Sequence, residues 1–149
     1  YGADRVSPLM TAIENKQIAT AAQLLKMGAN ANHQSLSGVR PVEQLIASYH
    51  DKAEFEEMIN LLIKSGADIG LRNKNSESLL FAAVRANNLA ALEILLSKGL
   101  DPKAINSQGK TAKDVAKQLK HKSLRKMLFQ AMYGRGLQGL VKSIFKKKS

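Results

Sequence analysis

The 149-residue chain contains no cysteine and no tryptophan, and only 5% of its residues are aromatic. Without cysteine it can form neither a disulfide framework nor a thiolate metal site, and nothing favours an oxidising compartment. No apolar run approaches the ~18 residues of a membrane-spanning helix, and the N-terminus lacks the charged-then-apolar plan of a signal peptide. The sequence therefore predicts an intracellular, cytoplasmic protein with one folded domain.

Motifs that carry catalysis are also missing. The three histidines, His33, His50 and His121, are far apart and match no metal-ligand spacing. The sequence holds no nucleophile elbow, phosphate-binding loop or dinucleotide fingerprint. It thus predicts a protein that is not an enzyme and needs neither a metal nor a cofactor.

Positive charge is distributed unevenly along the chain, whose formal net charge is +11. Residues 1–101 hold 10 Lys or Arg against 11 Asp or Glu, whereas the last 48 residues hold 13 against 1. A basic C-terminal section of this kind suits phosphate groups, an anionic membrane or an acidic protein, or it is a solvated face without a ligand. Charge alone leaves both interpretations open.

A short pattern recurs along the chain at a nearly fixed period. Leu- and Ile-rich stretches end at Gly28, Gly66 and Gly99. The interval between the last two glycines is 33 residues and the interval between the first two is 38, so the second unit carries five extra residues. Glycine at this place predicts the left-handed turn that ends a helix.

A second marker, twelve residues after each glycine, predicts where helices begin. It reads RPV at 40–42, SLL at 78–80 and TAK at 111–113, with SPL at 7–9 as the opening copy. Ser or Thr before proline is typical of a helix N-cap followed by the first helical position. The markers and the apolar stripes that follow them predict first helices at about 8–15, 41–49, 79–86 and 112–119, and second helices at about 18–27, 55–65, 89–98 and 121–132.

With SPLMTAI, SLLFAAV and TAKDVA at helix starts and GAN, GAD and GLD at helix ends, the unit resembles the ankyrin repeat. The resemblance implies an all-α repeat solenoid in residues 1–132, with four repeats at about 4–36, 37–74, 75–107 and 108–132, followed by an extension at 133–149. The family pattern T-P-L-H-x-A is matched loosely, because Met10, Glu43, Phe81 and Asp114 replace its histidine. Tetratricopeptide and armadillo solenoids are alternatives whose periods fit less well.

The resemblance also implies a mode of binding. Ankyrin repeats grip partner proteins on a concave surface made of the first helices and of β-turn fingers, which fall here near residues 32–39, 70–77 and 103–110. We therefore expect a monomeric module that binds another protein, as an adaptor or an effector. The expected contact residues are Thr11, Glu14, Asn15, Gln44, Ser48, Arg72, Asn73, Lys74, Arg85, Asn106, Gln108, Lys117 and Gln118.

The five extra residues of the second unit fall within residues 47–54, between its two helices. We expect them to lengthen a loop on the edge opposite the fingers, with Asp51 and Glu54 capping the helix that follows. Tyr49 and His50 either form a separate binding feature there or fill a gap in the packing. Gap filling is the more ordinary role, because added loop length costs little free energy.

Repeat four and the extension are basic for separable reasons. Lys113 and Lys117 polarise the last repeat, as expected of a terminal cap whose outer face has no neighbour. The extension predicts an amphipathic helix that packs on repeat four, lies on an anionic membrane or docks into a partner, and we favour packing. Its apolar face comprises Leu137, Leu140, Val141, Ile144 and Phe145, and its basic residues are Arg135, Lys142, Lys146, Lys147 and Lys148.

The rival to a protein-binding function is electrostatic binding of an anionic membrane or of nucleic acid by repeat four and the extension. Tyr133 and Phe145 are the only aromatic residues after Phe129, which weakens recognition of nucleic acid by base stacking. A membrane is therefore the better candidate of the two. The plan of a few degenerate repeats with a basic tail also resembles secreted bacterial effectors, which act inside a host cell.

Overall fold

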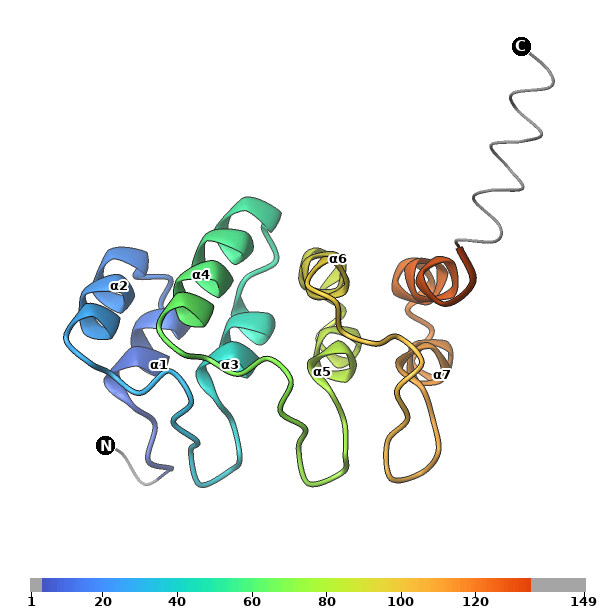
Figure 1. The fold of residues 1–149 in the computed structure, drawn as a ribbon, viewed down its shortest axis with the longest axis horizontal. Helices are drawn as coiled ribbons and strands as arrows, with labels where there is room; N and C mark the ends of the chain where they lie inside the picture. The colour runs from blue at the N-terminus through green and yellow to red at the C-terminus, as the bar shows by residue number, and fades with distance from the viewer. Residues whose placement is uncertain (1–3, 135–149) are drawn as a thin grey trace, which may run out of the picture.

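The computed structural model describes residues 4–134, which fold into a row of helix pairs (Figure 1). The first helices of the pairs lie side by side in one row, the second helices form a parallel row, and the connecting fingers project beyond the first row. This arrangement confirms the predicted all-α repeat architecture. The helices are α1 (Pro8–Glu14), α2 (Ile18–Lys26), α3 (Pro41–Ser48), α4 (Lys52–Lys64), α5 (Leu79–Arg85), α6 (Leu89–Ser97), α7 (Ala112–Gln118) and a further helix over residues 122–134.

The helices begin at the predicted markers. The Ser7 hydroxyl accepts a hydrogen bond from the backbone N–H of Met10, and Pro8 occupies the first turn of α1. Thr111 and Asp114 form a complete capping box at the start of α7, each side chain bonding the backbone of the other residue. Side-chain N-caps therefore mark the starts of α1 in repeat one and α7 in repeat four.

The second helices end at glycines, as predicted. Gly28, Gly66 and Gly99 have φ values of +94°, +99° and +93°. The N–H that follows the glycine bonds back across the turn, as in Ala67 N to Leu62 O at 2.9 Å. This is the Schellman arrangement, which satisfies carbonyls that the helix end leaves without partners.

The core is continuous from repeat to repeat and lies between the two helix rows. Phe55, Ile59 and Leu62 of α4 are fully buried, and so are Leu92 and Leu95 of α6. The apolar spacing of the second helices also predicts that Leu89 is buried, but this residue is 40% exposed at the first position of α6. Because each helix pair buries its apolar side against its neighbours, stability depends on the stacking of repeats.

The expected loop in repeat two is not longer than its counterparts, and this prediction was wrong. Three residues separate α3 from α4, and three likewise separate α1 from α2 and α5 from α6. The extra residues lie in helices instead, since α4 has 13 residues where α2 and α6 have nine, and α3 has eight where α1 and α5 have seven. Asp51 caps α4 by accepting from Glu54 N at 2.9 Å, and the helix formers Lys52 and Ala53 build the added turn.

Tyr49 belongs to the core. Its side chain is fully buried, whereas the next residue, His50, is exposed. The backbone carbonyl of Tyr49 accepts a hydrogen bond of 2.6 Å from the side-chain amide of Asn88 in the next repeat. The gap-filling interpretation of Tyr49 is confirmed, and its alternative role as a surface binding residue is wrong.

Candidate protein-binding face

Three fingers border the first helices, and the same backbone bond closes each of them. We call them finger one (residues 32–39), finger two (70–77) and finger three (103–110). The closing bonds run from Ser35 N to Val39 O at 2.9 Å, from Asn73 N to Glu77 O at 3.1 Å and from Asn106 N to Lys110 O at 2.9 Å. Counted from the residue whose N–H closes the turn, the fourth residue has a positive φ in each finger. These residues are Gly38, Ser76 and Gly109. The fingers are therefore defined turns with a common geometry.

Fingers two and three are joined to each other. Ser107 N donates to Asn75 O at 2.9 Å, which links the tips directly. Arg72 reinforces the link, because its Nη1 donates to Ser76 O within finger two at 3.2 Å and to Ile105 O in finger three at 3.1 Å. These bonds hold the two fingers in a fixed relative position.

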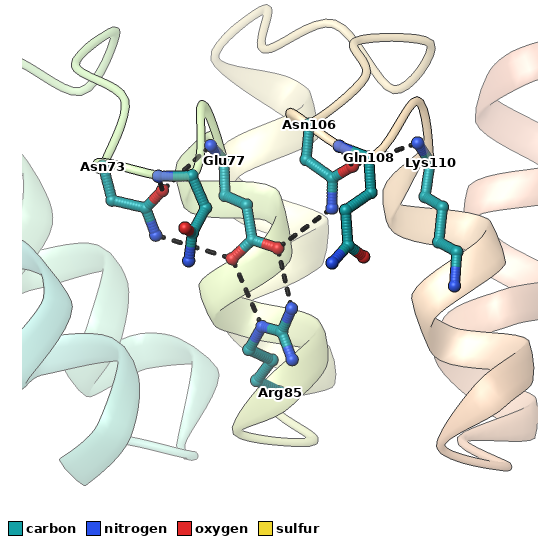
Figure 2. Close-up of polar contacts among 7 residues, drawn as sticks. Asn73, Glu77, Arg85, Asn106, Gln108 and Lys110 are labelled. Carbon is teal, nitrogen blue, oxygen red and sulfur yellow. Dashed lines mark hydrogen bonds and ion pairs between the residues drawn. The ribbon is translucent and has the colours of Figure 1, made fainter.

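The Glu77 carboxylate is the centre of a polar network that joins fingers two and three to α5 (Figure 2). Its side chain is only 6% exposed, yet groups from both fingers and from α5 approach it. Arg85 Nη2 lies 2.7 Å from Oε2 and Arg85 Nε lies 3.3 Å from Oε1, while the amides of Asn106 and Asn73 donate at 3.2 and 3.4 Å. A buried carboxylate with this many donors is fully compensated.

The environment of Glu77 sets its ionisation. Burial by itself raises the pKa of the Glu77 carboxyl, but hydrogen bonds from Arg85 and Asn106, the charge of Arg85 and the Asn73 amide hold that pKa below its ordinary value. Hydrogen bonding to Glu77 in turn raises the pKa of Arg85. The pair is therefore charged at neutral pH. Glu77 could not be selected from local pattern, because a carboxylate eight residues before an arginine matches no helical or turn pairing.

Asn106 was predicted to be an exposed contact residue, and this was wrong. The residue is 7% exposed. Its side-chain oxygen accepts from Gln108 N at 2.9 Å and Lys110 N at 3.0 Å, and its amide nitrogen donates to Glu77. Asn73 has the same role in finger two, where its oxygen accepts from Asn75 N and Glu77 N. Both asparagines use their side chains to shape the fingers.

The other predicted contact residues lie in two groups. Gln44 and Ser48 are half-buried and bond each other at 3.1 Å, so they offer little free surface. The exposed members of the set are Thr11, Glu14, Asn15, Arg72, Lys74, Arg85, Gln108, Lys117 and Gln118.

One half of the face, made of fingers two and three with α5 and α7, carries three exposed lysines. The side chains of Lys74 in finger two, Lys110 in finger three and Lys117 in α7 are exposed, and none of them forms an ion pair within the part of the chain that the structure describes. The carboxylates nearby are occupied, since Glu77 is buried under Arg85 and Asp114 bonds to Thr111. This half of the face is consequently positive.

The predicted basic residues of the tail, Arg135, Lys142, Lys146, Lys147 and Lys148, and its apolar face lie outside the described residues. Within residues 4–134, no three His, Asp or Glu side chains gather as metal ligands. Over the same range, none of the helices has the length and apolar character needed to cross a membrane.

Comparison with known proteins places this geometry in a family. Residues 45–136 match the family model for ankyrin repeats in three copies. The chain is 32% identical over 103 residues to human transient receptor potential cation channel subfamily A member 1, covering 69% of this chain and 9% of that protein. It is 28% identical over 101 residues to the putative ankyrin repeat protein FPV024 of fowlpox virus, covering 67% of this chain and 16% of that protein.

A third relative, the putative ankyrin repeat protein R664 of Acanthamoeba polyphaga mimivirus, is 25% identical over 95 residues, covering 64% of this chain and 59% of that protein. The chain thus spans less than two thirds of the length of each of these relatives. Family match and repeat geometry agree, and the chain belongs to the ankyrin-repeat family.

Proposed function

We propose that this chain binds another protein on the face made of α1, α3, α5, α7 and the three fingers. Ankyrin repeats are generally protein–protein interaction modules. The observation that carries the proposal for this chain is the bonded pair of fingers two and three, with exposed side chains of Arg72, Lys74 and Gln108. A fixed frame with exposed polar and charged groups is suited to recognise one partner surface.

The charge of this face favours a partner whose contact surface is acidic. Lys74, Lys110 and Lys117 form no ion pair in the described chain, where Lys110 is attracted by Asp114 only over a longer distance, so an acidic segment gains their attraction without breaking an existing pair. Arg85 contributes less, because two of its donors already bind Glu77. We infer an adaptor-like role inside a cell, performed by a monomer, and the absence of cysteine supports that location.

The test uses residues that the fold does not need. Arg72 and Arg85 are unsuitable, because their changes would loosen the fingers. Lys74→Glu combined with Lys117→Glu should lower the affinity for a captured partner about tenfold while leaving the melting temperature unchanged. Lys26→Glu with Lys64→Glu, exposed at the ends of α2 and α4, is the matched control. Equal binding by both double variants would refute the proposed face.

A second candidate function is electrostatic attachment through repeat four and the tail, to an anionic membrane or to nucleic acid. Residues 110–134 contain seven Lys or Arg and one Asp. That carboxylate, Asp114, is engaged in the capping box of α7. The tail beyond residue 134 adds further basic residues of the same sign. This excess of unpaired positive charge supports a polyanionic ligand.

A further inference from the structure

The outer side of the last helix carries a surface unlike the rest of the molecule. Lys122, the adjacent pair Arg125 and Lys126, Phe129 and Tyr133 recur every three or four residues, so they share one face of the helix over 122–134. We call these five residues the basic–aromatic surface. The helix buries its other face in the core through Leu124 and Leu128.

The aromatic residues of this surface remain accessible to solvent. Phe129 is 44% exposed and Tyr133 is 46% exposed. A shallow open hollow of about 270 Å³ lies beside Phe129 and is otherwise lined by Lys122, Arg125 and Lys126. Apolar ring surface and the aliphatic stems of three cations thus face the same way.

Lys113 of α7 holds the aromatic pair in place. The two ring centroids are 5.0 Å apart with an interplanar angle of 58°. Lys113 Nζ lies 5.6 Å from the Phe129 centroid and 5.5 Å from the Tyr133 centroid, a cation–π arrangement shared by both rings. The ammonium group thus covers one face of each ring, on which a nucleic acid base could otherwise stack.

The charge of the surface is only weakly compensated within the described chain, where Asp114 attracts Lys113 without forming an ion pair. Lys113, Lys122, Arg125 and Lys126 form no ion pair there. The nearest acidic residue in sequence is Asp114, whose pKa is lowered chiefly by the backbone hydrogen bond from Thr111 and also by the charges of Lys113 and Lys110, so it is charged, and its Oδ2 is engaged by Thr111. A ligand for this surface must therefore bring negative charge and also accept two exposed aromatic rings.

We propose that the basic–aromatic surface binds the headgroup region of an anionic phospholipid bilayer. Aromatic side chains favour the boundary between headgroups and acyl chains, and Lys and Arg beside them reach lipid phosphates. The inference deepens the second candidate function, because it selects a membrane as the anion and adds a binding element within the folded repeats. The tail is the rival occupant of this surface: its apolar residues suit the rings, whereas its Arg135 and lysines are repelled by the same cations, and the experiments below distinguish it from a membrane.

The natural absence of tryptophan provides a direct test. In the full chain, Phe129→Trp should show a blue-shifted emission with vesicles of phosphatidylserine and phosphatidylcholine, and brominated acyl chains should quench it. Vesicles of phosphatidylcholine alone should leave the emission unchanged. Leu36→Trp, at a finger-one position that is 65% exposed, is the matched control and should not respond. An unresponsive Phe129→Trp, or one already blue-shifted in buffer because the tail covers it, overturns the inference.

A second measurement separates this surface from the tail. Lys122→Gln, Arg125→Gln and Lys126→Gln together should lower partitioning onto anionic vesicles about 100-fold, from roughly fivefold for each basic residue near an anionic leaflet. The control variant removes three exposed lysines from other repeats, Lys26, Lys64 and Lys103, by the same change to Gln, and should retain binding. Loss of binding on changing only Lys142, Lys146, Lys147 and Lys148 to Gln would overturn the inference and leave attachment to the tail.

Binding to heparin or duplex DNA distinguishes the lipid inference from the second candidate function, electrostatic attachment to a polyanion. If the chain binds these polyanions and ignores anionic vesicles, the lipid inference is wrong and the second candidate function stands. If it binds neither, both are wrong. Melting temperatures of all variants are measured alongside, and Lys122→Gln, Arg125→Gln and Lys126→Gln should leave them unchanged because all three side chains are exposed.

Discussion

Arg85 in α5 donates two hydrogen bonds to the carboxylate of Glu77 at the base of finger two, at 2.7 and 3.3 Å. The pair joins an exposed cation to a buried anion, since the side chains are 52% and 6% exposed. Because Asn73 and Asn106 bond the same carboxylate, the conformation of both fingers depends on this contact.

We predict that Arg85→Gln destabilises the fold by about 1–2 kcal/mol. The change leaves a buried carboxylate without its strongest donors, and the partial exposure of the arginine limits the cost through solvent screening. Urea denaturation measures the effect. The matched control is Lys117→Gln, also exposed on a first helix but without a bonded carboxylate. Equal stability of the two variants would show that the fingers do not depend on Arg85.

Acid should weaken the protein through Glu77. Its folded-state pKa lies below the ordinary value of 4.5, so ionised Glu77 contributes stability that is present above pH 4.5 and is lost as the pH falls through the folded-state pKa. Melting temperatures measured between pH 3 and 7 should fall less steeply at the acid end for Glu77→Gln than for the wild type. Parallel curves for the two proteins would exclude Glu77 as a source of the acid sensitivity.

Ser76→Gly should stabilise finger two. Ser76 has a φ of +59° at the position that Gly38 and Gly109 occupy in the other fingers, with φ values of +88° and +74°. Glycine removes the strain of a left-handed serine, which exceeds the added entropy of the unfolded chain, for a net gain of about 0.5 kcal/mol. Gly109→Ser makes the reverse change and should be destabilising. A loss of stability in Ser76→Gly would contradict the strain argument.

Gly99→Val and Gly66→Val should each lower the melting temperature, with a cost above ~1 kcal/mol. Both glycines have φ above +90°, and a Cβ placed on either meets no atom within 4 Å. The loss therefore measures backbone strain and not a steric clash. An unchanged melting temperature in both valine variants would show that these glycines are not needed to end α4 and α6.

Replacement of Asn88 even by aspartate, whose side chain has nearly the same shape, should destabilise the protein. The residue is fully buried, its oxygen accepts from Ala91 N, and its amide donates to the carbonyls of Ile46 and Tyr49 at 2.8 and 2.6 Å. Asn88→Asp keeps the cap and places a carboxylate against two carbonyls, so we expect a loss of at least ~2 kcal/mol by thermal or chemical denaturation. Wild-type stability in this variant would show that the donated bonds matter little.

Much of the fold was predictable from local signals. Pro8, Thr111 and Gly66 each act on their own neighbours, so their spacing predicts helix starts and ends. The region that holds the extra residues of repeat two was predicted, but their conformation was not. The N-cap at Asp51 makes most of them part of α4. The N-cap and the helix-forming residues after it therefore extend a helix where a longer loop was expected.

The site was less predictable, for a physical reason. Asn106 and Glu77 are 29 residues apart in sequence and meet only when finger three stacks on finger two. Polar residues in turns look exposed in a sequence, yet these two are buried through contacts that no short window contains. Arg85 was correctly predicted to be exposed, although its ion pair with Glu77 was not foreseen.

The bond from Ser107 N to Asn75 O bears on the kinetics of binding. With Arg72 bridging the same two fingers, their relative motion is restrained before any partner arrives. A ligand that touches both fingers then loses little additional conformational entropy on docking, and its association rate is not limited by a search for the correct finger spacing. Slow hydrogen exchange at the Ser107 amide in the unbound protein would be the signature of this preorganisation.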